Sequence, residues 1–130
     1  MMQTVVQILL LTSYIYWETP VPHCIIEHSD DLDDQQLINA VFEGTLASGL
    51  FEEHDIKTRS QAFIHYQSAR SRQSFVHVSA KLLDGRTLQQ RAKLSQAILA
   101  QLQQLHLSAV SLTVEVLEIE TASYAKVVLG

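Results

Sequence analysis

The spacing of hydrophobic residues changes along the chain, and each change marks a predicted element. A short apolar run at 24–28 predicts a strand, and Pro22 can open it because proline at the first strand position costs no ladder hydrogen bond. Apolar residues then recur every three or four positions, which predicts an amphipathic helix of about four turns. This stripe contains Leu37, Ile38, Val41, Phe42 and Thr45 or Leu46. Gly49 follows, where a glycine commonly ends a helix.

Two predicted strands and a second helix follow, and then another strand. The segments 56–67 and 74–83 alternate as strands do, and the short polar link between them predicts a hairpin. Thr87 with Gln90 three residues later predicts a capping box that opens a second helix. Strand alternation returns at 111–120, and 123–129 predicts one more short strand.

Two β-α-β units in succession define the expected fold class. Each helix connects two parallel strands, and right-handed crossovers place both helices on one face of the sheet. The sequence therefore predicts an α+β fold with a four-stranded mixed sheet and one face without helices. That face needs cover, and a symmetric oligomer supplies it most simply.

Composition limits the possible functions. The 130 residues suit one domain, and 47% hydrophobic residues suit a folded core. The net charge of −5 and the scattered Lys and Arg residues argue against a nucleic-acid partner. Cys24 is the single cysteine, so no intrachain disulfide can form. None of the six histidines forms a helical i, i+4 pair or a cluster with cysteine, so no metal site is expected.

Residues 1–21 differ from the rest. They carry no Lys or Arg, whereas a signal peptide would begin with basic residues. Polar residues also interrupt their apolar stretch, which is too short to span a membrane. Val21 can be encoded by GTG, a bacterial start codon, and translation from there would give Met-Pro-His with a removable Met. We therefore expect a domain at 22–130 behind a leader or mis-assigned extension at 1–21. A misplaced start ranks first, a real extension second and an export signal last.

Several short motifs carry a resemblance to a known family. PHCIIE at 22–27, FVHV at 75–78 and GRTL at 85–88 occur in the order and spacing of 5-carboxymethyl-2-hydroxymuconate isomerase, of the tautomerase superfamily. The likeness runs from Pro22 to about Glu120. It implies the same two-unit fold, assembled as a homotrimer whose sheets surround a central channel.

The resemblance also implies an active site. Pro22 would be the catalytic N-terminal proline, and Arg59 and Arg86 would hold substrate carboxylates. Lys57 stands where the family has the first arginine of an Arg-x-Arg pair; it keeps the charge but loses bidentate geometry. The implied enzyme is a cofactor-independent, cytoplasmic isomerase of aromatic catabolism, acting on a 2-hydroxymuconate-type dicarboxylate without a membrane or nucleic-acid partner.

The implied proton shift needs one group with a pKa of about 7 that serves as base and then as acid. A free α-amino group has an ordinary pKa of about 7.7–8.0, and nearby arginines with partial burial would lower it. An amide nitrogen has no basic lone pair, so Pro22 merely opens a strand if residues 1–21 stay attached. The rival function is a non-catalytic oligomeric binding or scaffold protein with a blocked Pro22. A third option is dehalogenation or decarboxylation by the same residues.

Overall fold

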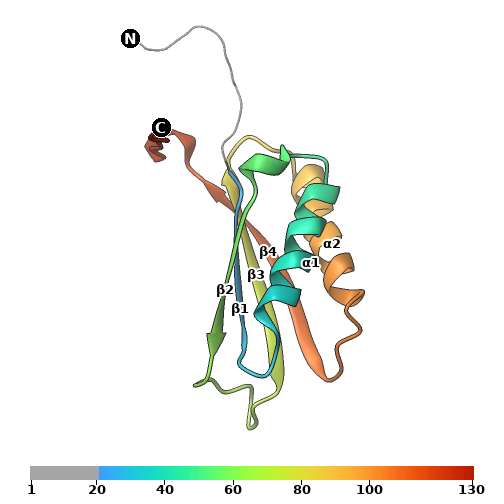
Figure 1. Cartoon of the computed structure of the whole chain (residues 1–130). Helices are drawn as coiled ribbons and strands as arrows, with labels where there is room; N and C mark the ends of the chain where they lie inside the picture. The colour runs from blue at the N-terminus through green and yellow to red at the C-terminus, as the bar shows by residue number, and fades with distance from the viewer. Residues whose placement is uncertain (1–20) are drawn as a thin grey trace, which may run out of the picture.

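The computed structural model describes residues 21–130, which form two β-α-β units in sequence (Figure 1). The first unit contains β1 (His23–Ser29), α1 (Asp34–Ala47) and β2 (Lys57–Phe63). The second contains β3 (Ser74–Leu83), α2 (Leu88–Gln103) and β4 (Val110–Ile119). Short 3₁₀ turns at Glu53–Asp55 and Thr121–Ser123 precede β2 and follow β4.

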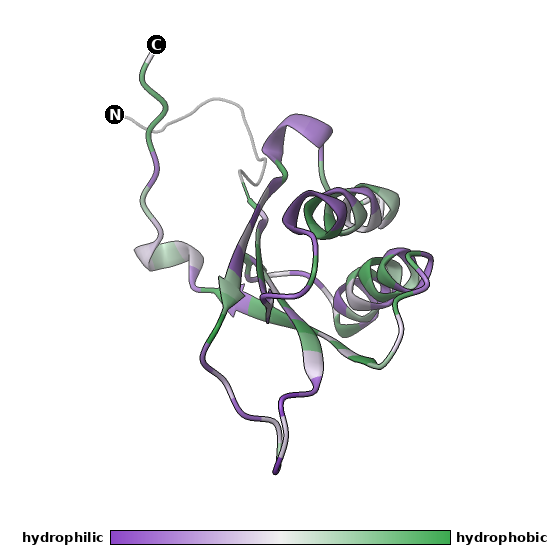
Figure 2. Cartoon of the chain, turned by 60° about the horizontal axis from the view of Figure 1, so that its bottom comes forward, coloured by the Kyte–Doolittle hydropathy of each residue, from purple (hydrophilic) through white to green (hydrophobic). Residues whose placement is uncertain are grey.

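The four strands form one mixed sheet in the order β2-β1-β3-β4. β1 is parallel to β2 and antiparallel to β3, and β3 is parallel to β4. Both helices cover one face, and the C-terminal segment lies on the other side (Figure 2). The predicted fold class is therefore confirmed.

The predicted hairpin between the second and third strands is wrong, because β1 lies between them and pairs with both. The reason is burial. β1 buries its alternate side chains and suits a central position, whereas no residue of β2 is fully buried. An edge strand needs less apolar surface, so the link at 64–73 passes the end of β1 instead of closing a tight turn.

The predicted strand at 123–129 is also absent from the described chain. After β4 the chain makes the turn at Thr121–Ser123 and continues to Gly130 without regular structure. Apolar residues are not enough for a strand, which needs a parallel or antiparallel neighbour for its backbone hydrogen bonds. The segment instead leaves the sheet beyond the ends of the strands (Figure 1).

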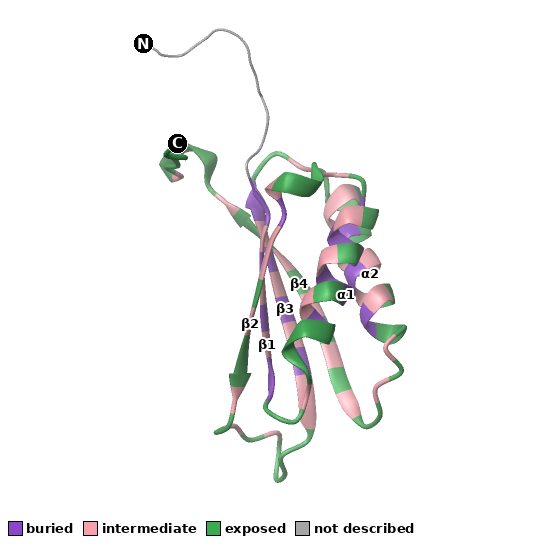
Figure 3. Cartoon of the chain, viewed as in Figure 1, coloured by how far each residue is buried: buried purple, intermediate pink, exposed green. Residues whose placement is uncertain are grey.

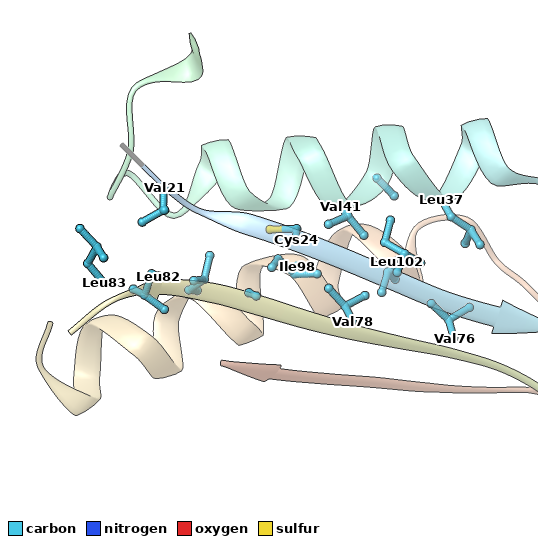
Figure 4. Packing of buried hydrophobic residues seen from close by; sticks show 14 residues of the cluster. Val21, Cys24, Leu37, Val41, Val76, Val78, Leu82, Leu83, Ile98 and Leu102 are labelled. Atoms are coloured by element: carbon cyan, nitrogen blue, oxygen red, sulfur yellow. The ribbon is translucent and has the colours of Figure 1, made fainter. Parts of the chain in front are cut away.

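The hydrophobic core lies between the sheet and the two helices (Figures 3 and 4). Alternate residues of β1 and β3 point into it, as their period-two pattern predicts. The buried side chains of the sheet include Cys24, Ile26, Val76, Val78, Ala80 and Leu82, and those of the helices include Leu37, Val41, Leu94, Ile98 and Leu102. The intervening residues of each strand therefore face away from the helices.

A polar contact fixes which face of β2 meets the helices. Asp34 in the first turn of α1 accepts hydrogen bonds from Ser60 Oγ at 2.5 Å and lies 2.7 Å from Nε2 of the buried His28. These hydrogen bonds lower the pKa of Asp34, with Ser60 the larger cause. Since Ser60 faces the helices, Lys57 and Arg59, at odd spacing from it, face the open side of the sheet.

Local signals set the helix ends. Asp33 caps α1 by accepting a hydrogen bond from the Gln36 backbone N–H at 2.9 Å. Gly49 follows this helix with a φ of 75°, the left-handed conformation that glycine adopts most readily. Thr87 and Gln90 form the predicted capping box at the start of α2, which holds the preceding Arg86 in a defined position.

Gly44 allows the two helices to pack closely. A Cβ at this position would lie 2.6 Å from the Ile98 Cα and 2.8 Å from the Ala97 carbonyl oxygen. We expect Gly44→Ala to lower the free energy of unfolding by about 1–3 kcal/mol through overpacking, although alanine favours helices. Urea denaturation measures this, with Glu43→Ala on the exposed side as the control. Unchanged or increased stability in Gly44→Ala would contradict the close packing.

Candidate active site

Pro22 lies at the entrance to β1, where its backbone is fixed by the neighbouring strand. Its carbonyl oxygen accepts a hydrogen bond from the Lys57 N–H at 3.1 Å, and the residue is buried. Val21 precedes it with a side chain 0% exposed, in the same core cluster as Leu82 and Leu83 (Figure 4). In this chain the Pro22 nitrogen is part of an amide, so it cannot act as a base.

Arg86 lies between β3 and the N-terminus of α2. Its Nη2 donates to the Leu50 carbonyl at 3.1 Å, and its Cζ lies 5.0 Å from the centre of the Phe51 ring. Burial lowers the pKa of Arg86. A cation beside the positive end of a helix dipole is unfavourable for stability, which favours a role in binding anions there.

Lys57 and Arg59 lie on the helix-free face of the edge strand β2. Arg59 Nη1 is 3.4 Å from Nδ1 of His23, which is the register partner of Lys57 on β1. Lys57 Nζ donates to the Asp55 carbonyl at 3.0 Å, and its pKa is lowered first by burial and then by Lys126. The two cations thus share one face, as their two-residue spacing predicts.

The structure therefore brings together some of the predicted site residues but not all. Lys57 and Arg59 meet around His23 on the open face, whereas Arg86 lies against the residues that follow α1, on the helix side. β1, the strand that Pro22 opens, lies between β2, which carries Lys57 and Arg59, and β3, which Arg86 follows in the chain. This arrangement suits a ligand with two separated negative charges better than a compact one.

Two further residues, His23 and Tyr124, lie beside these cations, and no motif indicated them. His23 Nε2 and Tyr124 Oη lie 2.9 Å apart, although the residues are 101 positions apart in the chain. The pKa of His23 is lowered, first by burial and then by Arg59, Lys57, Lys126 and Lys81. Strand alternation could have placed His23 and Lys81 on the open face, but no local pattern predicts the contact with Tyr124.

The lowered pKa of His23 gives a stability change with pH. Unfolded, the imidazole has an ordinary pKa of 6.5, so below this pH the unfolded chain binds a proton more readily than the folded chain. The free energy of unfolding should therefore be unaffected by His23 above this value and fall as pH falls below it. The carboxyl groups of Asp34 and Glu115 also have lowered pKa values. They reduce the free energy of unfolding only at more acidic pH, below their ordinary pKa values of 3.8 and 4.5.

We expect His23→Gln to reduce the loss of stability between about pH 7.5 and about pH 5.5, measured by urea denaturation. His65→Gln, at an exposed position, is the control and should follow the parent chain. An identical pH dependence in the His23 variant and the parent would show that His23 is not the titrating group.

The described residues contain neither a group of metal-ligand side chains nor a membrane-spanning helix. Between residues 21 and 130, no group of three or more His, Cys, Asp or Glu residues is placed to hold a metal ion. No helix within the same residues has the length and hydropathy needed to cross a membrane.

Comparison with solved structures places the fold among tautomerase-like proteins. A 5-carboxymethyl-2-hydroxymuconate isomerase from Deinococcus radiodurans R1 is 23% identical over 85% of this chain and 91% of that chain, with a TM-score of 0.70. A 5-carboxymethyl-2-hydroxymuconate delta-isomerase is 16% identical over 84% and 88%, with a TM-score of 0.66. A fused 4-OT symmetric trimer is 14% identical over 80% and 90%, also with a TM-score of 0.66. At these identities the likeness shows the fold alone.

The family follows from the sequence itself. The model of the 5-carboxymethyl-2-hydroxymuconate isomerase family matches residues 22–127, so the chain belongs to this family. A comparison with curated protein sequences gives no significant match. The family and the fold together support an isomerase or tautomerase, and the resemblance drawn from the motifs is confirmed.

Proposed function

We propose that this protein is a cofactor-independent keto–enol tautomerase that acts on a 2-hydroxymuconate-type unsaturated dicarboxylate in aromatic catabolism. Pro22 is its general acid and base. The observation that carries the proposal is the family match, which begins at Pro22 itself. The structure supports it with cations on both sides of the strand that Pro22 opens.

The proposed enzyme requires a free nitrogen on Pro22. Residues 1–21 are then a leader or a mis-assigned extension, and 22–130 is the functional domain. Loss of Val21 would convert the Pro22 amide into a secondary amine. It would also remove a fully buried side chain from the end of the core, leaving an apolar space beside that amine. Burial in such a space lowers the pKa of an amine towards neutrality.

The proposed reaction moves one proton. The Pro22 nitrogen accepts the proton of the enol hydroxyl, the conjugated double bonds shift, and the protonated amine then donates a proton to a carbon further along the chain. One proton is taken and one is returned, so the amine is regenerated. General acid–base catalysis of this kind contributes about 10²–10⁴-fold to the rate.

Substrate binding in this proposal uses the two groups of cations. Arg59, with Lys57 beside it, binds one carboxylate from the open face, and Arg86 binds the other from the helix side. Charge-assisted hydrogen bonds are stronger than neutral ones, which suits recognition of a dianion by an acidic protein. The Phe51 ring beside Arg86 offers an apolar surface for the conjugated chain between the carboxylates.

We also propose a homotrimer that works in the cytoplasm. Among residues 21–130, only the C-terminal segment lies on the helix-free side of the sheet (Figure 2), and symmetric association would cover the rest of that face. One structural neighbour is described as a symmetric trimer, which supports the same assembly here. The C-terminal segment exposes the apolar side chains of Val127, Val128 and Leu129. An interface with another copy of the chain would bury them.

The rival proposal is a non-catalytic oligomeric binding or scaffold protein of the same fold. It is favoured by the buried Val21, which belongs to the core of the chain as described. Intact mass of the native protein separates the two: a mass for residues 22–130 favours the enzyme, and one for the whole chain favours the rival.

The function is tested by assaying residues 22–130 with a panel of substrates. We expect turnover of 2-hydroxymuconate, which is monitored by the loss of its dienol absorbance. Halogenated acrylates and malonate semialdehyde test for dehalogenation and decarboxylation. Turnover of one of these alone would replace the tautomerase proposal, and turnover of none would favour the rival.

A further inference from the structure

A row of basic and imidazole side chains crosses the open face of the sheet. His23 is in register with Lys57 on β2 and with Lys81 on β3, so the three residues lie side by side on three neighbouring strands. Neighbouring strands lie about 4.8 Å apart, so the two lysine backbones are separated by about 10 Å with the imidazole between them. Like charges that share one sheet face repel one another, and a bound anion would relieve this repulsion.

Two more cations join this row. Arg59 approaches His23 from the next open-face position of β2. Lys126 lies two residues beyond Tyr124, which contacts His23, and its charge lowers the pKa of both His23 and Lys57. We call Lys57, Arg59, Lys81 and Lys126 the open-face basic cluster. It contains four of the nine Lys and Arg residues in a chain of net charge −5. Asp55 beside Lys57 and Glu115 near Lys81 offset part of the repulsion within this cluster, and a bound anion would offset more of it.

The hydrogen bonds around His23 leave Tyr124 with a proton to donate. A guanidinium only donates, so His23 Nδ1 must accept from Arg59 and carries no hydrogen. The neutral ring then has its hydrogen on Nε2, which donates to Tyr124 Oη at 2.9 Å. The hydroxyl hydrogen of Tyr124 is therefore directed elsewhere, to a ligand or to water.

We propose that the open-face basic cluster and the Tyr124 hydroxyl form one carboxylate subsite, to which Lys81, Lys126 and Tyr124 contribute as binding residues. The subsite holds the substrate carboxylate furthest from Arg86, an assignment that rests on the proposed function. Because Tyr124 and Lys126 follow the turn at Thr121–Ser123, the C-terminal segment is part of the binding site. His23 is a positioning residue that orients Tyr124.

The binding test uses the full chain and does not depend on turnover. Muconate, which has two carboxylates and no enol hydroxyl, is titrated by calorimetry, with sorbate as the monocarboxylate of the same conjugated length. We expect Lys126→Ala and Lys81→Ala each to weaken muconate binding about 10-fold or more, as for a charged hydrogen bond. Tyr124→Phe, which keeps the ring, should weaken it about 3- to 10-fold. Sorbate binding should change less in all three variants.

Lys93→Ala, on the exposed side of α2, is the matched control and should bind muconate as the parent does. The inference is overturned if the Lys81 and Lys126 variants bind muconate like this control, or if the parent binds muconate no better than sorbate. In chains that begin at Pro22, Lys126→Ala should raise KM for 2-hydroxymuconate with little change in kcat. If those chains show no turnover at all while muconate binding depends on the cluster, the proposed function fails and the subsite stands.

Discussion

A chain that begins at Pro22 is expected to ketonise 2-hydroxymuconate at least about 100-fold faster than the chain with residues 1–21 attached. The reason is that an amide nitrogen has no basic lone pair, and a positioned general base contributes about 10²–10⁴-fold. The measurement is kcat/KM for both forms at one pH, with the reaction monitored by the loss of dienol absorbance.

Two controls make this comparison specific to the nitrogen. Because Val21 is fully buried, the free energy of unfolding must be measured for both forms to show that the shorter chain keeps its fold. A chain that carries one glycine before Pro22 restores the amide with a minimal side chain, and it should be as inactive as the full chain. Equal activity in all three forms would exclude Pro22 as the proton shuttle.

Replacing Arg86 is expected to have the second largest effect. Arg86→Ala in the chain that begins at Pro22 should lower kcat/KM by about 10- to 100-fold, the loss of one charge-assisted interaction with a carboxylate. Arg86→Lys should recover only part of it, because an ammonium cannot make the bidentate contact. Steady-state kinetics on 2-hydroxymuconate and on a monocarboxylate analogue measure this loss.

Arg70→Ala is the matched control, since Arg70 is an exposed arginine in the link between β2 and β3. Arg86 also contacts Leu50 and Phe51, so the stability of its variants must be measured in parallel. A folded Arg86→Ala variant whose kcat/KM stays within about twofold of the parent would show that Arg86 does not bind the substrate. Surface substitutions usually change the free energy of unfolding little, so loss of folding is not expected in the Arg70 control.

Much of the fold could be predicted because local rules decide it. The alternation at 74–83 marks β3 with the bounds that the structure has, and it places Val76 and Val78 on one face, which the structure buries. The capping box at Thr87 and the glycine at position 49 mark helix ends through hydrogen bonds and backbone conformation within a few residues. The order β-α-β, repeated, then fixes the fold class through the handedness of crossovers.

The rest depends on contacts between distant segments. The hairpin prediction failed because strand order follows from which strand buries most side chains, and the short polar link gives no information about this. The contact between His23 and Tyr124 joins the start of β1 to the segment after β4, and the partners of His23 on both neighbouring strands come from the register. Motifs therefore indicated the separate candidate residues, and the structure places Lys57 and Arg59 near His23 and Arg86 near Leu50 and Phe51.

Covalent labelling of the Pro22 nitrogen tests the central proposal most directly. A suitable reagent is 2-oxo-3-pentynoate, an oxo acid whose triple bond is activated by the neighbouring carbonyl group. A free secondary amine can add to the activated triple bond of this reagent, whereas an amide nitrogen cannot. We expect intact mass and peptide mapping to show one adduct, on Pro22, in the chain of residues 22–130 and no adduct in the full chain. Labelling of Cys24 instead, or equal labelling of both chains, would contradict the role of Pro22.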